Sequence, residues 1–339
     1  MFPRSSREQT GLFTPRSIVS LLALTPAVQA PSGPFSMSLR LALARVLARL
    51  PGPLKSPLLA QVGGRLLHAV AQDHPVLSGL RTNLGTRPGA PFRFPAGYAS
   101  RAHWFDHGLN HRGDAGAMRL FDALAPHYEG LLDVGAHLGV YALVLARRHP
   151  HWRCHAFEPT PALHAALTAN IAAADLAARV QGHAAAVADQ DGALHFYVVP
   201  GDGQCSSLVD HAAQGVPLTV DAVRLDSFVA ARQLDPRRWL LKVDVETAEP
   251  LVVAGAGATL AEVPVLVMEM LGPTRRAGLI NALAERFGFD IYYIAGRELR
   301  AKTGDDGDDV HGEYNWLFTR LPRLKLTDLV AGHGLRISG

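Results

Sequence analysis

The stretch Leu131-Leu132-Asp133-Val134-Gly135-Ala136-His137-Leu138-Gly139 decides the fold of this chain. An apolar strand runs into a short turn with two glycines, and an amphipathic helix that ends at Arg147 and Arg148 follows. This is the strand–turn–helix opening of a nucleotide-binding α/β unit. The turn lacks the third glycine that lets a backbone close on a pyrophosphate. We therefore expect a ligand that carries an adenosine but no phosphates, such as S-adenosylmethionine (SAM).

A second acidic residue supports this interpretation. Glu158 follows Cys154-His155-Ala156-Phe157, which reads as the next strand, precedes Pro159 and lies 23 residues after Gly135. In adenosine-binding folds, an acid about 20 residues past the glycines accepts hydrogen bonds from the ribose hydroxyls. The alternative is a solvated glutamate at a strand end, but the spacing from the glycine turn favours the ribose role.

A third motif makes the chain recognisable. Residues 241–249, Leu-Lys-Val-Asp-Val-Glu-Thr-Ala-Glu, resemble the K-[IV]-D-[VI]-E-G-x-E signature of the FkbM-type SAM-dependent methyltransferases. Further agreement comes from 133–139, Phe157-Glu158-Pro159, Asn170-Ile171, Ser206-Ser207-Leu208, Leu225-Asp226-Ser227-Phe228 and Glu269. The resemblance covers roughly residues 125–320 in the family's order and implies methyl transfer from SAM.

Two positions depart from the family pattern. His137 stands where the family usually has Asn, and Thr247 stands where it usually has Gly. A β-branched residue tolerates a positive φ poorly. We therefore expect either a turn at Thr247 that is not left-handed or an altered approach of the substrate.

The alternation of elements from residue 115 onward predicts an α/β fold with a parallel sheet. The family resemblance implies that this is a Rossmann-like class I methyltransferase fold. Its mostly parallel seven-stranded sheet carries helices on both faces. Strands are expected near 131–135, 154–158, 180–187, 240–245, 264–270, 290–295 and 315–320, and helices near 116–127, 139–148, 161–173, 248–258 and 275–287. Residues 193–224 predict a β-hairpin insertion with its tip at 201–207.

The chain divides into four expected parts. Residues 1–36 read as a disordered extension before a second candidate start at Met37, and 37–114 as a basic helical region. Residues 115–320 form the methyltransferase domain and 321–339 a C-terminal tail. The amphipathic, arginine-bearing stretch 38–50 is expected to pack on the main domain or to make weak contact with an anionic membrane surface.

Charge and cysteine content narrow the function classes. Residues 1–100 carry 11 Lys and Arg against 2 Asp and Glu, whereas the remainder carries 22 against 28. A mildly acidic catalytic domain argues against an extended nucleic-acid surface. Only Cys154 and Cys205 are present, too few for a disulfide framework. No apolar run is long enough to span a bilayer, so we expect a cytoplasmic protein, with export as the minority alternative.

The candidate site residues cluster at expected strand ends, where ligands bind in open α/β sheets. Expected contacts to the cofactor are Asp133, Gly135, Ala136, His137, Gly139, Glu158 and Asp244, and expected catalytic residues are Glu246, Asp244, Lys242 and Glu269. Asp244 and Glu246 are two residues apart and should share one face of the strand end.

Other roles remain open for these acids. They could form an ion network with Lys242 or bind Mg²⁺, although we expect catalysis without a metal. Glu249 could serve only as a partner of a helix dipole. Asp226 is expected to cap the helix that starts at Ser227.

The expected function is SAM-dependent O-methylation of a hydroxyl on a sugar or small metabolite. The acceptor class is implied by the family resemblance, with a small molecule or glycan as partner and no nucleic acid. A catalytically silent SAM-binding module is the alternative. An NAD-dependent dehydrogenase or epimerase is disfavoured by the missing glycine and by the absence of a Tyr-x-x-x-Lys pair.

Overall fold

Strand β1 (Gly130–Val134) lies inside a nine-stranded sheet in the computed structural model, which describes residues 112–198, 216–272, 278–305 and 314–339. All five residues of β1 are buried, as expected for a parallel strand covered on both faces. The sheet order is β12 (Arg336–Ser338), β10 (Glu298–Lys302), β9 (Asp290–Ala295), β11 (Asn315–Thr319), β8 (Val265–Glu269), β7 (Trp239–Val243), β1, β2 (Arg153–Phe157) and β3 (Val180–His183).

Strand direction places the site residues at one edge. The neighbours β8, β7, β1, β2 and β3 are all parallel, whereas β11 runs antiparallel between β8 and β9. Asp133 of β1 is in register with Lys242 of β7 and Ala156 of β2. The residues that follow these strands therefore meet at the same carboxyl edge, which confirms the expected α/β fold with its mostly parallel sheet.

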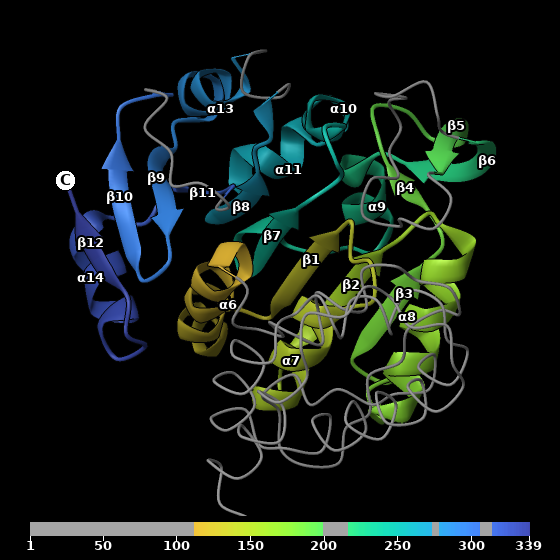
Figure 1. Ribbon diagram of the computed structural model, residues 1–339, viewed down its shortest axis with the longest axis horizontal. Helices are drawn as coiled ribbons and strands as arrows, with labels where there is room; N and C mark the ends of the chain where they lie inside the picture. Colours follow the sequence, from red (N-terminus) through yellow and green to blue (C-terminus); the bar gives the residue numbers. More distant parts are fainter. Residues whose placement is uncertain (1–111, 199–215, 273–277, 306–313) are drawn as a thin grey trace, which may run out of the picture. The chain divides into compact units, whose positions relative to one another are not determined.

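Helices cover both faces of the sheet (Figure 1). One face packs against α6 (Arg112–Leu124), α7 (Val140–Arg148), α8 (Pro161–Ala173) and α14 (Arg323–Ala331). The other packs against α9 (Leu225–Ala231), α10 (Glu249–Gly255), α11 (Gly257–Glu262) and α13 (Leu279–Phe287). Because side chains alternate along a strand, Leu131 joins the first core and Leu132 and Val134 join the second.

The expected hairpin insertion is present. Strands β5 (Gly192–Val198) and β6 (Val216–Val223) pair antiparallel. The expected strand 180–187 is divided, because its last residues form β4 (Ala186–Val187), which pairs with β6 in a separate three-stranded sheet. The hairpin tip, including Ser206 and Ser207, lies outside the described residues.

The sheet extends beyond the expected seven strands at the C-terminal side. Strand β10 pairs antiparallel with β9, and β12 pairs parallel with β10. Residues 323–338, expected as a tail, thus supply α14 and an edge strand.

Several expectations fall on residues that the structure does not describe. They include the extension 1–36, nearly all of the region 37–114 with its stretch 38–50, and Cys205. Within the described ranges, no helix is both long enough and apolar enough to cross a membrane.

Candidate functional site

The glycine turn after β1 is held by the neighbouring strand β2. The backbone N–H groups of Gly135 and Ala136 both donate to the Phe157 carbonyl oxygen, at 3.1 and 2.8 Å. Gly135 has φ +79° and Gly139 has φ +83°, a region that L side chains rarely adopt. A Cβ at Gly135 would also collide with the carbonyl oxygen of Asp244. The turn therefore brings its backbone directly against the segment that follows β7.

Glu158 ties this turn to the end of β2. Its Oε2 accepts a hydrogen bond from the His137 N–H at 3.0 Å, and its Oε1 accepts one from the Thr160 N–H at 2.8 Å. The side chain is buried, which raises its pKa to about 7 against the opposing effect of the two N–H groups. Each carboxylate oxygen keeps a second lone pair, so Glu158 can still accept bonds from ribose hydroxyls.

Lys242 lies buried beneath the site. Its ammonium donates a hydrogen bond to Oδ2 of Asp244 at 2.8 Å. The residue as a whole is only 2% exposed. Burial alone would lower the pKa of Lys242, but the negative charges of Asp244 and Asp133 outweigh it and raise this pKa. Lys242 is thus a charge partner of the acids and lies away from solvent.

Two contributors were missed by sequence reasoning. The ring of Tyr141, in the first turn of α7, lies 4.6 Å from the Lys242 ammonium, and its hydroxyl donates to Oδ1 of Asp114 on α6 at 2.7 Å. A cation over an aromatic face is attracted by the ring quadrupole. The sequence offered one signal for this contact, a tyrosine among apolar helix residues. A buried tyrosine hydroxyl needs a hydrogen-bond partner.

Asp133 is almost fully buried at the end of β1. Neither of its carboxylate oxygens meets a partner with good hydrogen-bond geometry in the described part of the chain. Burial raises the pKa of Asp133 to about 6, although the Lys242 ammonium and the Ala142 backbone N–H oppose this shift. A buried carboxyl without a bonding partner is a place where a ligand or an ordered water is expected.

The segment after β7 is a turn and not a continued strand. Strand β7 ends at Val243, and both Glu246 (φ +52°) and Thr247 (φ +75°) are left-handed. Of the two alternatives expected at Thr247, a turn that is not left-handed is therefore wrong, and an altered approach of the substrate stays a prediction. Oε1 of Glu249, a fully buried residue that begins α10, accepts the N–H groups of Val245 and Thr247 at 3.3 and 3.2 Å. Glu249 thus fixes the turn.

Three expected acids converge at this turn. Carboxylate oxygens of Asp244, Glu246 and Glu269 all lie within 4.8 Å of one another, a spacing at which they could hold a metal ion. Burial and the charges of Asp244 and Glu246 raise the pKa of Glu269 well above its usual range, and Glu269 is hydrogen-bonded to Asp244. A bond between two carboxyls needs one proton, and the raised pKa of Glu269 favours its neutral form.

Asp226 has a different role from the one expected. Its carboxylate accepts bonds from the N–H groups of Ala258 and Thr259, at 3.0 and 2.8 Å, at the start of α11. At the N-terminus of α9, Asp191 instead accepts hydrogen bonds from the Arg224 N–H and the Ser227 hydroxyl. Asp226 therefore caps the spatially adjacent helix, a pairing that local sequence does not reveal.

The residues present fit a SAM molecule. The turn has no room for a Cβ at Gly135, Glu158 offers ribose acceptors, and Asp133 is a buried carboxyl with no well-aligned hydrogen bond to the described residues. The surplus of carboxylates over the one buried ammonium at this edge suits a cofactor that carries a sulfonium and an ammonium.

Comparison with known proteins agrees with this geometry. Residues 133–291 match the family described as Methyltransferase FkbM domain. The methyltransferase sdnD of Sordaria araneosa is 28% identical over 190 residues, covering 48% of this chain and 73% of that protein. The 31-O-demethyl-FK506 methyltransferase FkbM of Streptomyces tacrolimicus is 28% identical over 191 residues, covering 48% and 72%.

Among solved structures, the precorrin-6y C5,15-methyltransferase from Geobacter metallireducens is 11% identical over 61% of this chain and 87% of that chain, with a TM-score of 0.35. That likeness says nothing about the reaction of this chain. The matched region begins at Asp133 and spans the glycine turn, Glu158 and the acidic turn, so residues 133–291 of this chain are similar to the FkbM methyltransferase domain.

Proposed function

We propose that this protein transfers the methyl group of SAM to a hydroxyl oxygen of a sugar or other small metabolite. One observation carries the proposal: Asp244, Glu246 and Glu269 bring three carboxyl groups together beside the glycine turn. A hydroxyl acceptor loses a proton as it is methylated, and a nearby carboxylate can accept that proton as general base.

Glu246 is the best candidate for the base. Asp244 already accepts a hydrogen bond from the Lys242 ammonium, and Glu269 has the raised pKa of a protonated acid. Glu246 is half-buried, so part of its side chain faces solvent, the side from which an acceptor can approach. Bound SAM supplies the methyl group on a sulfonium, and the protein's part is to align the acceptor oxygen, which is worth up to about 7–11 kcal/mol of the barrier.

The choice of oxygen as acceptor also has support from a relative. The Streptomyces tacrolimicus protein is named for methylation at an oxygen of 31-O-demethyl-FK506. We extend only the acceptor atom to this chain, together with the small-molecule character of the partner.

The test is a methyl-transfer assay on the purified protein. It would be incubated with SAM and a panel of monosaccharides and aliphatic alcohols, beside matched amines and thiols, with S-adenosylhomocysteine and the methylated product measured by mass spectrometry. We expect product from hydroxyl acceptors, its loss in Glu246→Gln, and normal turnover in the surface control Asp328→Asn. Methylation of amines alone would contradict the proposal.

A catalytically silent SAM-binding module is the second candidate. It is favoured by Thr247, which takes a left-handed conformation next to Glu246 where the family signature has glycine. Tight SAM binding without turnover of any acceptor, in both the wild type and Thr247→Gly, would support this alternative.

A further inference from the structure

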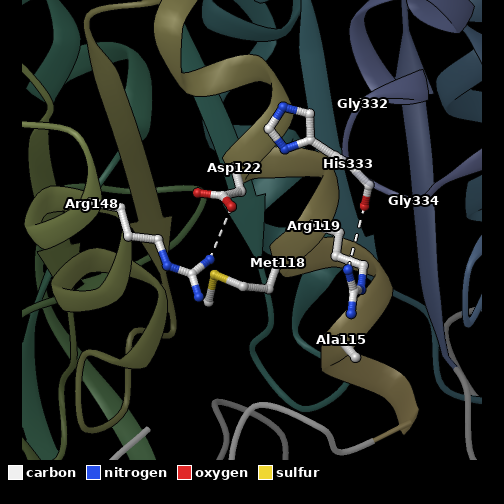
Figure 2. Close-up of a pocket in the computed structure, with 8 residues that line it drawn as sticks. All are labelled: Ala115, Met118, Arg119, Asp122, Arg148, Gly332, His333 and Gly334. Carbon is white, nitrogen blue, oxygen red and sulfur yellow. Dashed lines mark hydrogen bonds and ion pairs between the residues drawn. The ribbon is translucent and has the colours of Figure 1, made fainter. Parts of the chain in front are cut away.

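A second pocket lies between α6 and the turn that follows α14. It has a volume of about 460 Å³ and is lined from α6 by Met118, Arg119 and Asp122, from the end of α7 by Arg148, and by His333 and Gly334 (Figure 2). Arg148 ends α7, whereas the glycine turn precedes the first residue of that helix. The pocket is therefore separate from the cofactor turn.

The acid of this pocket is already neutralised. Oδ2 of Asp122 pairs with Arg148 at 3.0 Å, and Oδ1 lies 2.8 Å from Nε2 of His149. A carboxylate shared by a guanidinium and an imidazole has little charge left to offset a second guanidinium.

Arg119 is that second guanidinium. Its one described hydrogen bond is a long one, from Nη1 to the backbone oxygen of His333 at 3.4 Å (Figure 2). Within the described ranges, no carboxylate lies at ion-pair distance from Arg119. Because a guanidinium has five N–H donors, Arg119 can bind an oxyanion without giving up an existing ion pair.

We propose that this pocket binds a small metabolite through its phosphate or carboxylate group. Arginine matches such planar or tetrahedral oxyanions with two parallel hydrogen bonds. The volume falls in the range of small-molecule sites and exceeds the need of a bare oxyanion. Met118 and Ala115 offer apolar contact to the rest of such a ligand.

The test uses inorganic phosphate and citrate as probes, each titrated into the full-length protein at constant ionic strength. Binding is followed by isothermal calorimetry and by the thermal midpoint, with S-adenosylhomocysteine present to fill the cofactor site. Arg119→Gln removes the uncommitted guanidinium, and Arg148→Gln gives a second variant if the first does not fold. Arg147→Gln is the control, because it also removes one arginine charge and lies on α7 beside Arg148, outside the residues that line the pocket.

We expect saturable binding of at least one probe by the wild type and by Arg147→Gln. Loss of a charge-assisted hydrogen bond should weaken binding about tenfold or more in Arg119→Gln. A stronger response to phosphate than to citrate would point to a phosphorylated ligand, and the reverse to a carboxylate. Absence of saturable binding, or equal affinities in the Arg119→Gln and Arg147→Gln variants, would overturn the proposal. No step depends on methyl transfer, so this result is independent of the proposed function.

Discussion

The ammonium nitrogen of Lys242 lies 2.8 Å from Oδ2 of Asp244, two residues further along the chain. The same ammonium faces the Tyr141 ring at 4.6 Å, and Lys242 is in register with Asp133 on the adjacent strand. The buried Lys242 ammonium thus offsets the negative charge of both Asp244 and Asp133, which lie close together at the cofactor end of the sheet. We therefore expect the acidic site to depend on this lysine for its stability.

Replacing Lys242 by Met should show that dependence. The variant keeps the volume of the side chain but leaves the buried carboxyl of Asp133 and the half-buried one of Asp244 without their cation. Breaking a buried pair in this way costs about 3–5 kcal/mol. Urea unfolding would measure it, with the exposed Lys325→Met of α14 as a control expected within about 0.5 kcal/mol of the wild type. Equal stability of the two variants would contradict the role of Lys242.

Thr247→Gly should stabilise the protein. Thr247 has φ +75°, and a left-handed conformation costs an L residue about 1–2 kcal/mol, part of which is offset by the entropy of the added glycine. We expect a gain of about 1 kcal/mol in unfolding free energy. Thr247→Ala keeps the Cβ and should recover less. A destabilised Thr247→Gly would mean that contacts of the threonine side chain outweigh the strain.

Local signals in the sequence were sufficient for the central elements. The strand–turn–helix at 131–139 and the alternation of the hairpin strands both predict what is observed, because each depends on periodicity within one segment. The acids at the strand ends also meet as expected, since parallel strands share a carboxyl edge.

What the sequence left undetermined depends on contacts between distant segments. Asp226 caps α11 rather than its own helix, and the strand expected at 180–187 splits because its end pairs with β6. Tyr141 is tied to Asp114 across 27 residues. No local periodicity identifies such pairings: a tyrosine in an apolar helix indicates that its hydroxyl needs a partner but not which residue supplies it.

The pair His155 and His183 lies on the face of the sheet opposite Lys242. It should make the free energy of unfolding fall in acid. Nδ1 of His155 lies 3.1 Å from Nε2 of His183, and burial, with nearby positive charges, lowers both pKa values to about 4. In the unfolded chain these groups titrate near 6.5. Their contribution is therefore complete above pH 6.5 and is lost as the pH falls toward 4.

The variant His155→Phe separates the effect of the histidines on stability from the effect of the buried acids Asp133 and Glu158. Asp133 and Glu158 have raised pKa values, of about 6 and 7, so their contributions are lost in the opposite direction, as the pH rises. His155→Phe keeps an aromatic ring beside Trp239 but cannot be protonated. As the pH is lowered from 7 to about 4.5, the unfolding free energy of His155→Phe should rise relative to that of the wild type, as measured by urea midpoints. A difference independent of pH would refute the assignment.

Glu158→Ala should weaken binding of both SAM and S-adenosylhomocysteine, because both carry the ribose. The expected loss is about 1.5–3 kcal/mol for a charged hydrogen-bond acceptor. Since Glu158 also accepts the His137 and Thr160 N–H groups, the unfolding free energy must be measured beside the calorimetric affinities. Unchanged affinities in a folded Glu158→Ala protein would remove the ribose assignment.

The last prediction separates the roles of the clustered acids. Asp244, held by Lys242, should act mainly on SAM, so Asp244→Asn should lose SAM affinity. Glu246 should act on the acceptor, so Glu246→Gln should bind SAM normally but lose turnover, because an amide cannot accept the hydroxyl proton. Calorimetry with SAM and single-turnover kinetics measure the two effects separately. Full activity of Glu246→Gln would exclude it as the base.

A metal ion at the cluster would produce a different pattern. The oxygens of Asp244, Glu246 and Glu269 lie close enough to ligate Mg²⁺, which could lower the pKa of an acceptor hydroxyl. In that case EDTA would abolish wild-type activity and added Mg²⁺ would restore it. We expect EDTA to leave turnover unchanged, because the ammonium of Lys242 already offsets the charge of Asp244 and the raised pKa of Glu269 favours its neutral form. If the cluster were a structural ion network, Asp244→Asn and Glu246→Gln would both lower stability while their folded fractions stayed active.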